Sequence, residues 1–173
     1  MDPTEASQLI SDRDEQDRIE RSHRLVELTS LRLIARQEGF SGQAAQWLFE
    51  DVKATWLYGC FTATVLTAHA FCSLQLAGRI RFLPDDPTLP DEAESLEHLA
   101  RIAMTAGVLD VDLQARLLEL HDRYRFYTAA GLHEHDVGLD RHLVEAAAAV
   151  GEHPLLLDAR HALATAVRLI HRT

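Results

Sequence analysis

Several residue types are scarce in this 173-residue chain, and each scarcity argues against a class of protein. Two cysteines are too few for a disulfide-rich secreted domain. Lysine and arginine together number 17 against 27 aspartates and glutamates, which gives a formal net charge of −10. We therefore expect no general affinity for DNA or for an anionic membrane surface, because both attract a positively charged protein.

The two cysteines, Cys60 and Cys72, lie in a stretch that we predict to be one helix. Twelve helical residues span about 18 Å, which is beyond the reach of a disulfide bond. We expect two free thiols packed in the core, and a reducing, cytoplasmic location. The first residues also lack the basic and apolar regions of a secretory signal.

Alternation of polar and apolar residues, which is typical of strands, is absent, whereas helical periodicity is abundant. The sequence predicts an all-α fold: a single-domain, up-and-down bundle of about six helices with a long central buried helix. We divide the chain into an N-terminal helix, 1–38, and a bundle core, 41–173. The first expected helix begins near Glu5 or Ser11 and ends near Gln37. The other five span residues 42–80, 91–106, 111–130, 139–149 and 155–170.

The first predicted helix has a charged first half and an apolar second half. Ile19, Val26 and Leu33 recur there at heptad spacing, with Leu25 and Leu28 nearby. This pattern is compatible with two arrangements: docking of the second half on the bundle, or a dimer-forming arm.

No formal charge occurs between Lys53 and Arg79. The stretch is long enough to cross a bilayer. Its polar residues are spread around the helix, however, which favours a buried position at the centre of a bundle over a membrane span. We expect the aromatic residues at its start, Trp47, Phe49 and Trp56, to pack in the core.

Helix ends are marked farther along the chain. Gly107 is expected to stop one helix, and Asp110 to cap the next, whose inward residues are Leu113, Leu117 and Leu120.

Seven of the ten histidines lie in the last third of the chain, including His133 and His135 in a predicted loop. A metal site in a helical bundle usually needs paired Glu-x-x-His motifs, or histidine pairs on one helical face. Only one such motif, Glu20 with His23, is present. We expect no metal site and no cofactor.

The segment from Asp122 to Tyr127 places two arginines among three aromatic residues at a predicted helix end. One interpretation is structural: the arginines offset the helix dipole and the aromatic rings pack. The other is functional: Arg123, Tyr124 and Tyr127, with His135, form a cationic stacking site for RNA or a nucleotide.

Three features together resemble HEPN-type helical domains and the related DUF4145-like bacterial proteins, over about residues 54–170. They are the stretch from Tyr58 to Ala70, the helix–glycine–helix step from Leu96 through Gly107 to Leu113, and the arginines 123 and 125 followed by His133. The resemblance implies a compact helical bundle that commonly forms homodimers. It also implies a place among bacterial phage-defence or toxin–antitoxin proteins, whose active members are metal-independent RNases.

In such an RNase, Arg125 would stabilise the phosphate and His133 would transfer protons. This chain departs from the family motif, because Phe126 stands where a polar residue is usual and seven residues separate Arg125 from His133. We therefore expect a protein that acts through association, as a homodimer or by binding a protein partner or RNA, without nuclease activity. The alternatives are an active RNase that uses Arg125 and His133, and a bundle that binds a small ligand beside Trp56 and His69.

Overall fold

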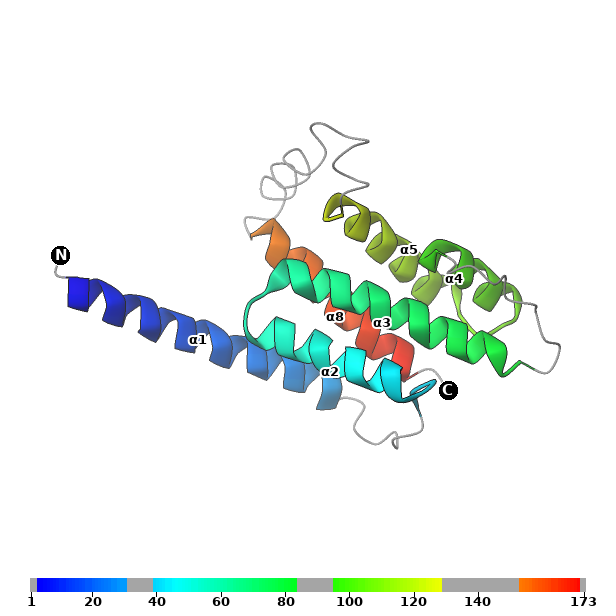
Figure 1. Ribbon diagram of the computed structural model, residues 1–173, viewed down its shortest axis with the longest axis horizontal. Coiled ribbons are helices and arrows are strands. Elements are labelled where there is room, and N and C mark those ends of the chain that lie inside the picture. Colours follow the sequence, from blue (N-terminus) through cyan, green and yellow to red (C-terminus); the bar gives the residue numbers. More distant parts are fainter. Residues whose placement is uncertain (1–2, 31–38, 84–94, 129–152, 172–173) are drawn as a thin grey trace.

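The computed structural model describes residues 3–30, 39–83, 95–128 and 153–171, and the regular secondary structure in these ranges is all helical (Figure 1). The described helices pack against one another as a single-domain bundle, which confirms the predicted fold class. They are α1 (Pro3–Ser30), α2 (Gln43–Leu57), α3 (Phe61–Arg81), α4 (Leu96–Thr105), α5 (Val111–Phe126) and α8 (Pro154–Ile170). The predicted helix 139–149, His133 and His135 lie outside the described residues.

The predicted continuous helix 42–80 is instead a pair of helices, α2 and α3, that turn back alongside each other (Figure 1). Gly59 makes the reversal with φ +71, in the left-handed region that glycine enters without a steric penalty. The Cys60 amide then donates to the Thr55 carbonyl at 2.9 Å. Both cysteines are free, as expected, but Cys60 lies exposed at this turn and only Cys72 is in the core.

Helix α3 is the central element, because α2, α4, α5 and α8 all pack on it. Its inward residues are fully buried: Thr64, Val65, Ala68, Phe71, Cys72, Gln75, Leu76 and Ile80. The expectation of complete enclosure is wrong along one strip, where Ala70 and Leu74 are exposed. Of the helices in the described ranges, none combines the length and apolar character that crossing a bilayer requires.

The aromatic residues of α2 divide between core and surface. Trp56 and Phe49 are buried, and the Phe49 ring lies 5.3 Å from the Phe71 ring between centroids. Trp47, which was also expected to pack, keeps 64% of its surface exposed because it lies on the outer face of α2.

The predicted signals around α4 and α5 are confirmed. The α4 helix ends before Gly107, which has φ +72, and the Asp110 side chain caps α5 by accepting from the Leu113 amide at 2.6 Å. Leu113, Leu117 and Leu120 face the core with no exposed surface.

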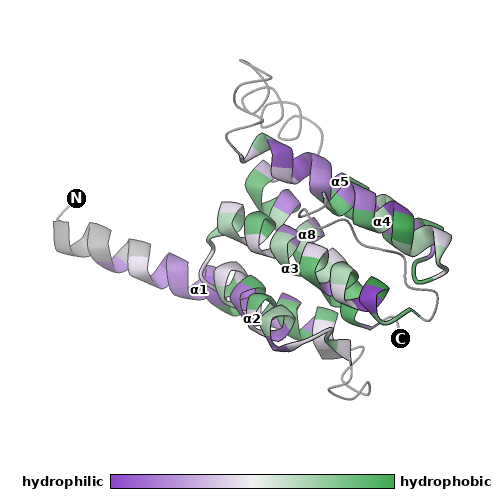
Figure 2. Cartoon of the chain, turned by 45° about the vertical axis from the view of Figure 1, so that its right-hand side comes forward, coloured by the Kyte–Doolittle hydropathy of each residue, from purple (hydrophilic) through white to green (hydrophobic). Residues whose placement is uncertain are grey.

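Helix α1 docks on the bundle by its second half, as the docking alternative predicts. Arg21 donates to the Leu57 carbonyl at 3.0 Å, and the Trp56 indole donates to the Arg21 carbonyl at 2.9 Å. Leu25 and Leu28 pack against the core. The first half of α1 extends past the bundle (Figure 1). The coloured part of α1 next to the bundle is mostly hydrophilic (Figure 2), and residues 11–20 are all exposed.

The segment before α2 is held against α3 by a buried glutamine. Gln75 accepts from the Ser41 amide at 2.9 Å and donates to the Gly39 carbonyl. This approach is possible because residue 78 is glycine: a Cβ there would lie 2.3 Å from the Ser41 Cβ.

We predict that Gly78→Ala destabilises the protein by about 1–2 kcal/mol, as overpacking of a close contact does. In an open helix the same change would stabilise by about 1 kcal/mol, so the close approach reverses the sign. Urea unfolding measures the difference. Adding Ser41→Gly should restore much of the loss, and a Gly78→Ala variant as stable as wild type would contradict the argument.

Candidate functional site

The predicted RNA-contacting residues at the end of α5 face inward to a buried carboxylate. Arg123 of α5 and Tyr127, directly after α5, both bond to Asp158 of α8, whose exposed fraction is 1%. Arg123 also bonds to Glu119 one turn earlier. A carboxylate removed from water needs such partners, because burying an unpaired charge costs several kcal/mol. These contacts therefore join α5 to α8 and occupy two of the four side chains that the functional interpretation assigned to RNA.

Burial also changes the titration of this cluster. It raises the pKa of Tyr127 to about 12, although the Arg123 charge opposes the shift, so the phenol stays protonated and donates to Asp158. Burial lowers the pKa of His161, whose Nε2 lies 3.1 Å from the Arg116 carbonyl oxygen. For Glu119, burial favours a higher pKa, but the hydrogen bond from Arg123 and the charges of His161, Arg123 and Arg116 outweigh it and lower the pKa.

Tyr124 belongs to a second cluster, between α3 and α5. Its ring stacks on His69, with centroids 3.7 Å apart and planes 10° from parallel. His69 Nε2 lies 3.1 Å from His121 Nδ1, so one imidazole donates a hydrogen bond to the other. Burial, followed by the charge of His121, lowers the pKa of His69 to about 4. One face of the Tyr124 ring is thus covered by His69.

The candidate catalytic pair is described only in part. Arg125 is exposed near the end of α5, while His133 and His135 lie outside the described residues. Within the ranges that the structure describes, no three histidine, cysteine, aspartate or glutamate side chains gather in a way that would hold a metal ion. The cavity that Trp56 borders is lined by α1, the α2–α3 turn and the start of α8, and His69 is not among its lining residues.

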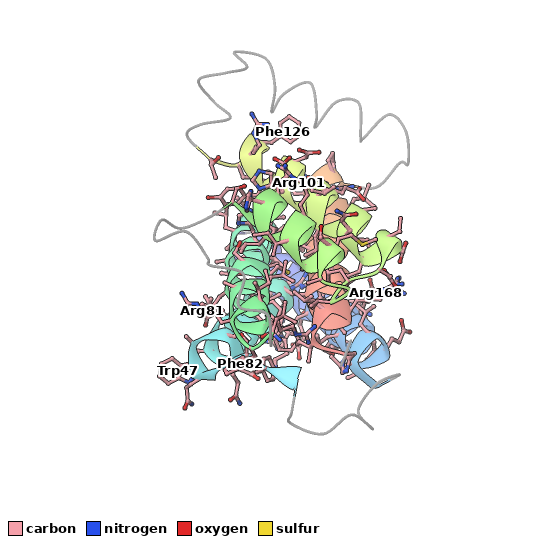
Figure 3. The ribbon with its side chains drawn as sticks, turned by 90° about the vertical axis from the view of Figure 1, so that its right-hand side faces the viewer. Trp47, Arg81, Phe82, Arg101, Phe126 and Arg168 are labelled. Atoms are coloured by element: carbon pink, nitrogen blue, oxygen red, sulfur yellow. The ribbon has the colours of Figure 1, made fainter. Side chains whose placement is uncertain are left out.

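Four uncharged residues of the α2–α3 pair are exposed: Trp47 on α2, Ala70 and Leu74 on α3, and Phe82 directly after α3. Charged residues border them, since exposed Asp51 lies one turn from Trp47 and exposed Arg81 precedes Phe82. Trp47 and Phe82 lie at the same end of the molecule, away from Arg168 (Figure 3). We call these four residues the uncharged face.

Two of these arrangements were not predicted. The sequence around Asp158 does not indicate that its carboxylate is a buried hydrogen-bond acceptor, because its partners Arg123 and Tyr127 are more than 30 residues away in the chain. The His69–His121 pair joins residues 52 apart in sequence. The absence of charge between Lys53 and Arg79 was a visible signal for the uncharged face, but it was interpreted as evidence of burial.

Comparison with protein-family models, with curated proteins and with solved structures finds no match to this chain.

We predict that His69 makes stability depend on pH. The pKa of its imidazole is about 4 in the folded protein and ordinary, 6.5, in the unfolded chain, so the unfolded state binds more protons between these values. The free energy of unfolding should therefore fall as pH falls from about 6.5 to about 4.

Urea unfolding between pH 4.5 and 6.5 tests this dependence. His69→Phe, which keeps a ring against Tyr124, should flatten the slope, whereas His98→Phe at an exposed position on α4 should not. Equal slopes in His69→Phe and wild type would refute the assignment.

Proposed function

We propose that this chain is a HEPN-like helical protein that acts through association and not through nuclease activity, and that its first partner is a second copy of itself. The observation that carries the proposal is the uncharged face. The resemblance to HEPN-type domains adds the expectation of homodimers and of a place in a bacterial defence or toxin–antitoxin system.

The charge of the molecule favours this face as the contact. Two copies that each carry a formal charge of −10 repel each other over most of their surfaces. The uncharged face is free of that repulsion, and it presents the two large exposed side chains Trp47 and Phe82. Aromatic residues are enriched at the centres of protein interfaces, where charged residues are depleted.

A two-fold arrangement also matches the charges that border this face. The Thr55 and Thr67 hydroxyls approach to 3.5 Å, which places Asp51 of α2 near the level of residue 71 of α3. If α3 meets its own copy in antiparallel fashion about Leu74, Arg81 comes to the level of residue 67 of the second copy. That position is about one helical turn from Asp51. The same patch on both subunits then supplies both members of an ion pair, as a two-fold interface requires.

The contacts of the candidate RNA-binding residues support a role without RNA cleavage. Arg123 and Tyr127 bond to Asp158, and Tyr124 stacks on His69. An RNase needs groups directed at the phosphate of its substrate, but these three side chains are engaged within the fold.

We predict that light scattering over a range of concentrations gives a mass near twice the 19.4 kDa of one chain. Ala70→Glu places a carboxylate on the uncharged face, one helical turn from Leu74, and should shift the equilibrium to monomers. Ala115→Glu is the matched control, because it makes the same change at an exposed alanine of α5.

A wild-type protein that stays monomeric at the highest concentration would overturn the homodimer, as would equal dimerisation of the two variants. The border contact has its own test. Arg81→Glu should weaken the dimer, and Arg81→Glu combined with Asp51→Arg should restore it.

We predict that the purified protein does not cleave total RNA in the presence of EDTA. The reason is that Asp158 holds Arg123 within the fold, so this arginine is not available to bind a phosphate beside Arg125. Gel electrophoresis of the RNA gives the result. Cleavage that disappears in an Arg125→Ala/His133→Ala double variant would instead establish an active RNase.

A further inference from the structure

A cavity of about 690 Å³ lies between α1, the α2–α3 turn and the start of α8. These three segments meet at the same end of the bundle (Figure 1). The volume falls within the range of small-molecule binding sites, which are roughly 300–1,000 Å³. None of the four residues of the uncharged face lines this cavity, so the proposed self-association does not involve it.

One wall of the cavity is aromatic. Trp56 and Phe61 lie 6.1 Å apart between ring centroids, and Tyr58 presents a ring that is 71% exposed. The Trp56 indole N–H is already bonded to the Arg21 carbonyl, so this wall offers apolar ring surface and no indole donor. Such a wall favours a planar ring as its occupant.

Besides this apolar wall, the cavity has positively charged groups, which come from arginines. Arg13 and Arg24 of α1 and Arg160 of α8 line the cavity together with Arg21, which is fixed by its bond to the Leu57 carbonyl. The start of α8 adds to their charge, because its first turn holds no acidic residue and its N-terminus carries a partial positive charge. These groups favour an anion.

Carboxylates are present as well. Asp14, Asp17 and Glu20 line the same cavity, and Asp14 lies 3.9 Å from Arg21 in a weak ion pair. Among the described residues that line the cavity, four are arginines and three are carboxylates. Arg24 is also paired with Glu27 at 3.1 Å, so an anion that meets Arg24 takes the place of that carboxylate.

We propose that this cavity binds a small aromatic anion, a planar ring that bears a phosphate or a carboxylate. The ring stacks against Tyr58 and Phe61, and the anionic group meets Arg24 and Arg160. This site gives the molecule a ligand-binding activity that is separate from its self-association.

Isothermal titration calorimetry tests the site with four probes. 1-Naphthyl phosphate and 1-naphthoate carry both the ring and the charge, 1-naphthol carries the ring alone, and inorganic phosphate carries the charge alone. The two aromatic anions should bind, the better of them identifying the anionic group, and each should bind at least about tenfold more tightly than naphthol or phosphate. Higher salt should weaken their binding, since screening reduces the attraction of the guanidinium groups.

Two variants locate the binding. Arg24→Gln should weaken binding of the aromatic anions by about tenfold, the loss expected for one charge-assisted hydrogen bond. Tyr58→Ala should weaken it through loss of the stacking surface. The control is Arg101→Gln, which removes a comparable exposed ion pair on α4 and should leave binding unchanged.

Failure of both aromatic anions to bind at millimolar concentration would overturn the proposal. Equal binding of naphthol would show an apolar site with no preference for charge, and would also overturn it. Binding that survives both Arg24→Gln and Tyr58→Ala would place the ligand elsewhere and reject this cavity. Circular dichroism and urea unfolding verify that each variant is folded.

Discussion

The burial of α3 is the constraint on which the rest of the structure depends. This helix has no charged residue until Arg79, and it keeps its apolar residues from water only because α2, α4, α5 and α8 pack on it. Gln75 and Arg79, near its end, then hold the segment before α2 and the end of α8 through the Gly39 and Ile170 carbonyls. A helix that is apolar on most sides requires neighbours on most sides, and this requirement sets the arrangement of the bundle.

The polar groups inside the protein serve mainly to join helices. Asp158 connects α8 to α5, Gln75 connects α3 to the segment before α2, and the Arg21–Trp56 contact connects α1 to α2. Each is a buried or half-buried group whose hydrogen bonds would be costly to lose. Arg123 and Tyr127, two of the candidate RNA-binding residues, are thereby committed to packing. We therefore propose that function lies on two other surfaces: the uncharged face and the arginine-lined cavity.

How much could be predicted depended on how far apart the interacting residues are in sequence. The stop at Gly107, the cap at Asp110 and the inward leucines of α5 were predicted, because each signal is contained within a few neighbouring residues. The reversal at Gly59 was missed, since a lone glycine in an apolar run does not by itself distinguish a tolerated helical glycine from a turn. The inward direction of Arg123 was missed because its partner, Asp158, is 35 residues away.

The sequence alone determined the helical class, the helix caps around α4 and α5, and the identity of the uncharged stretch as the centre of the fold. These follow from periodicity and from side chains that act on their own backbone. Only the tertiary structure decided which part of that stretch is covered, that Trp56 is buried while Trp47 is exposed, and that four arginines surround one cavity. These outcomes depend on contacts between helices that are far apart in sequence, so no single stretch of the chain can predict them.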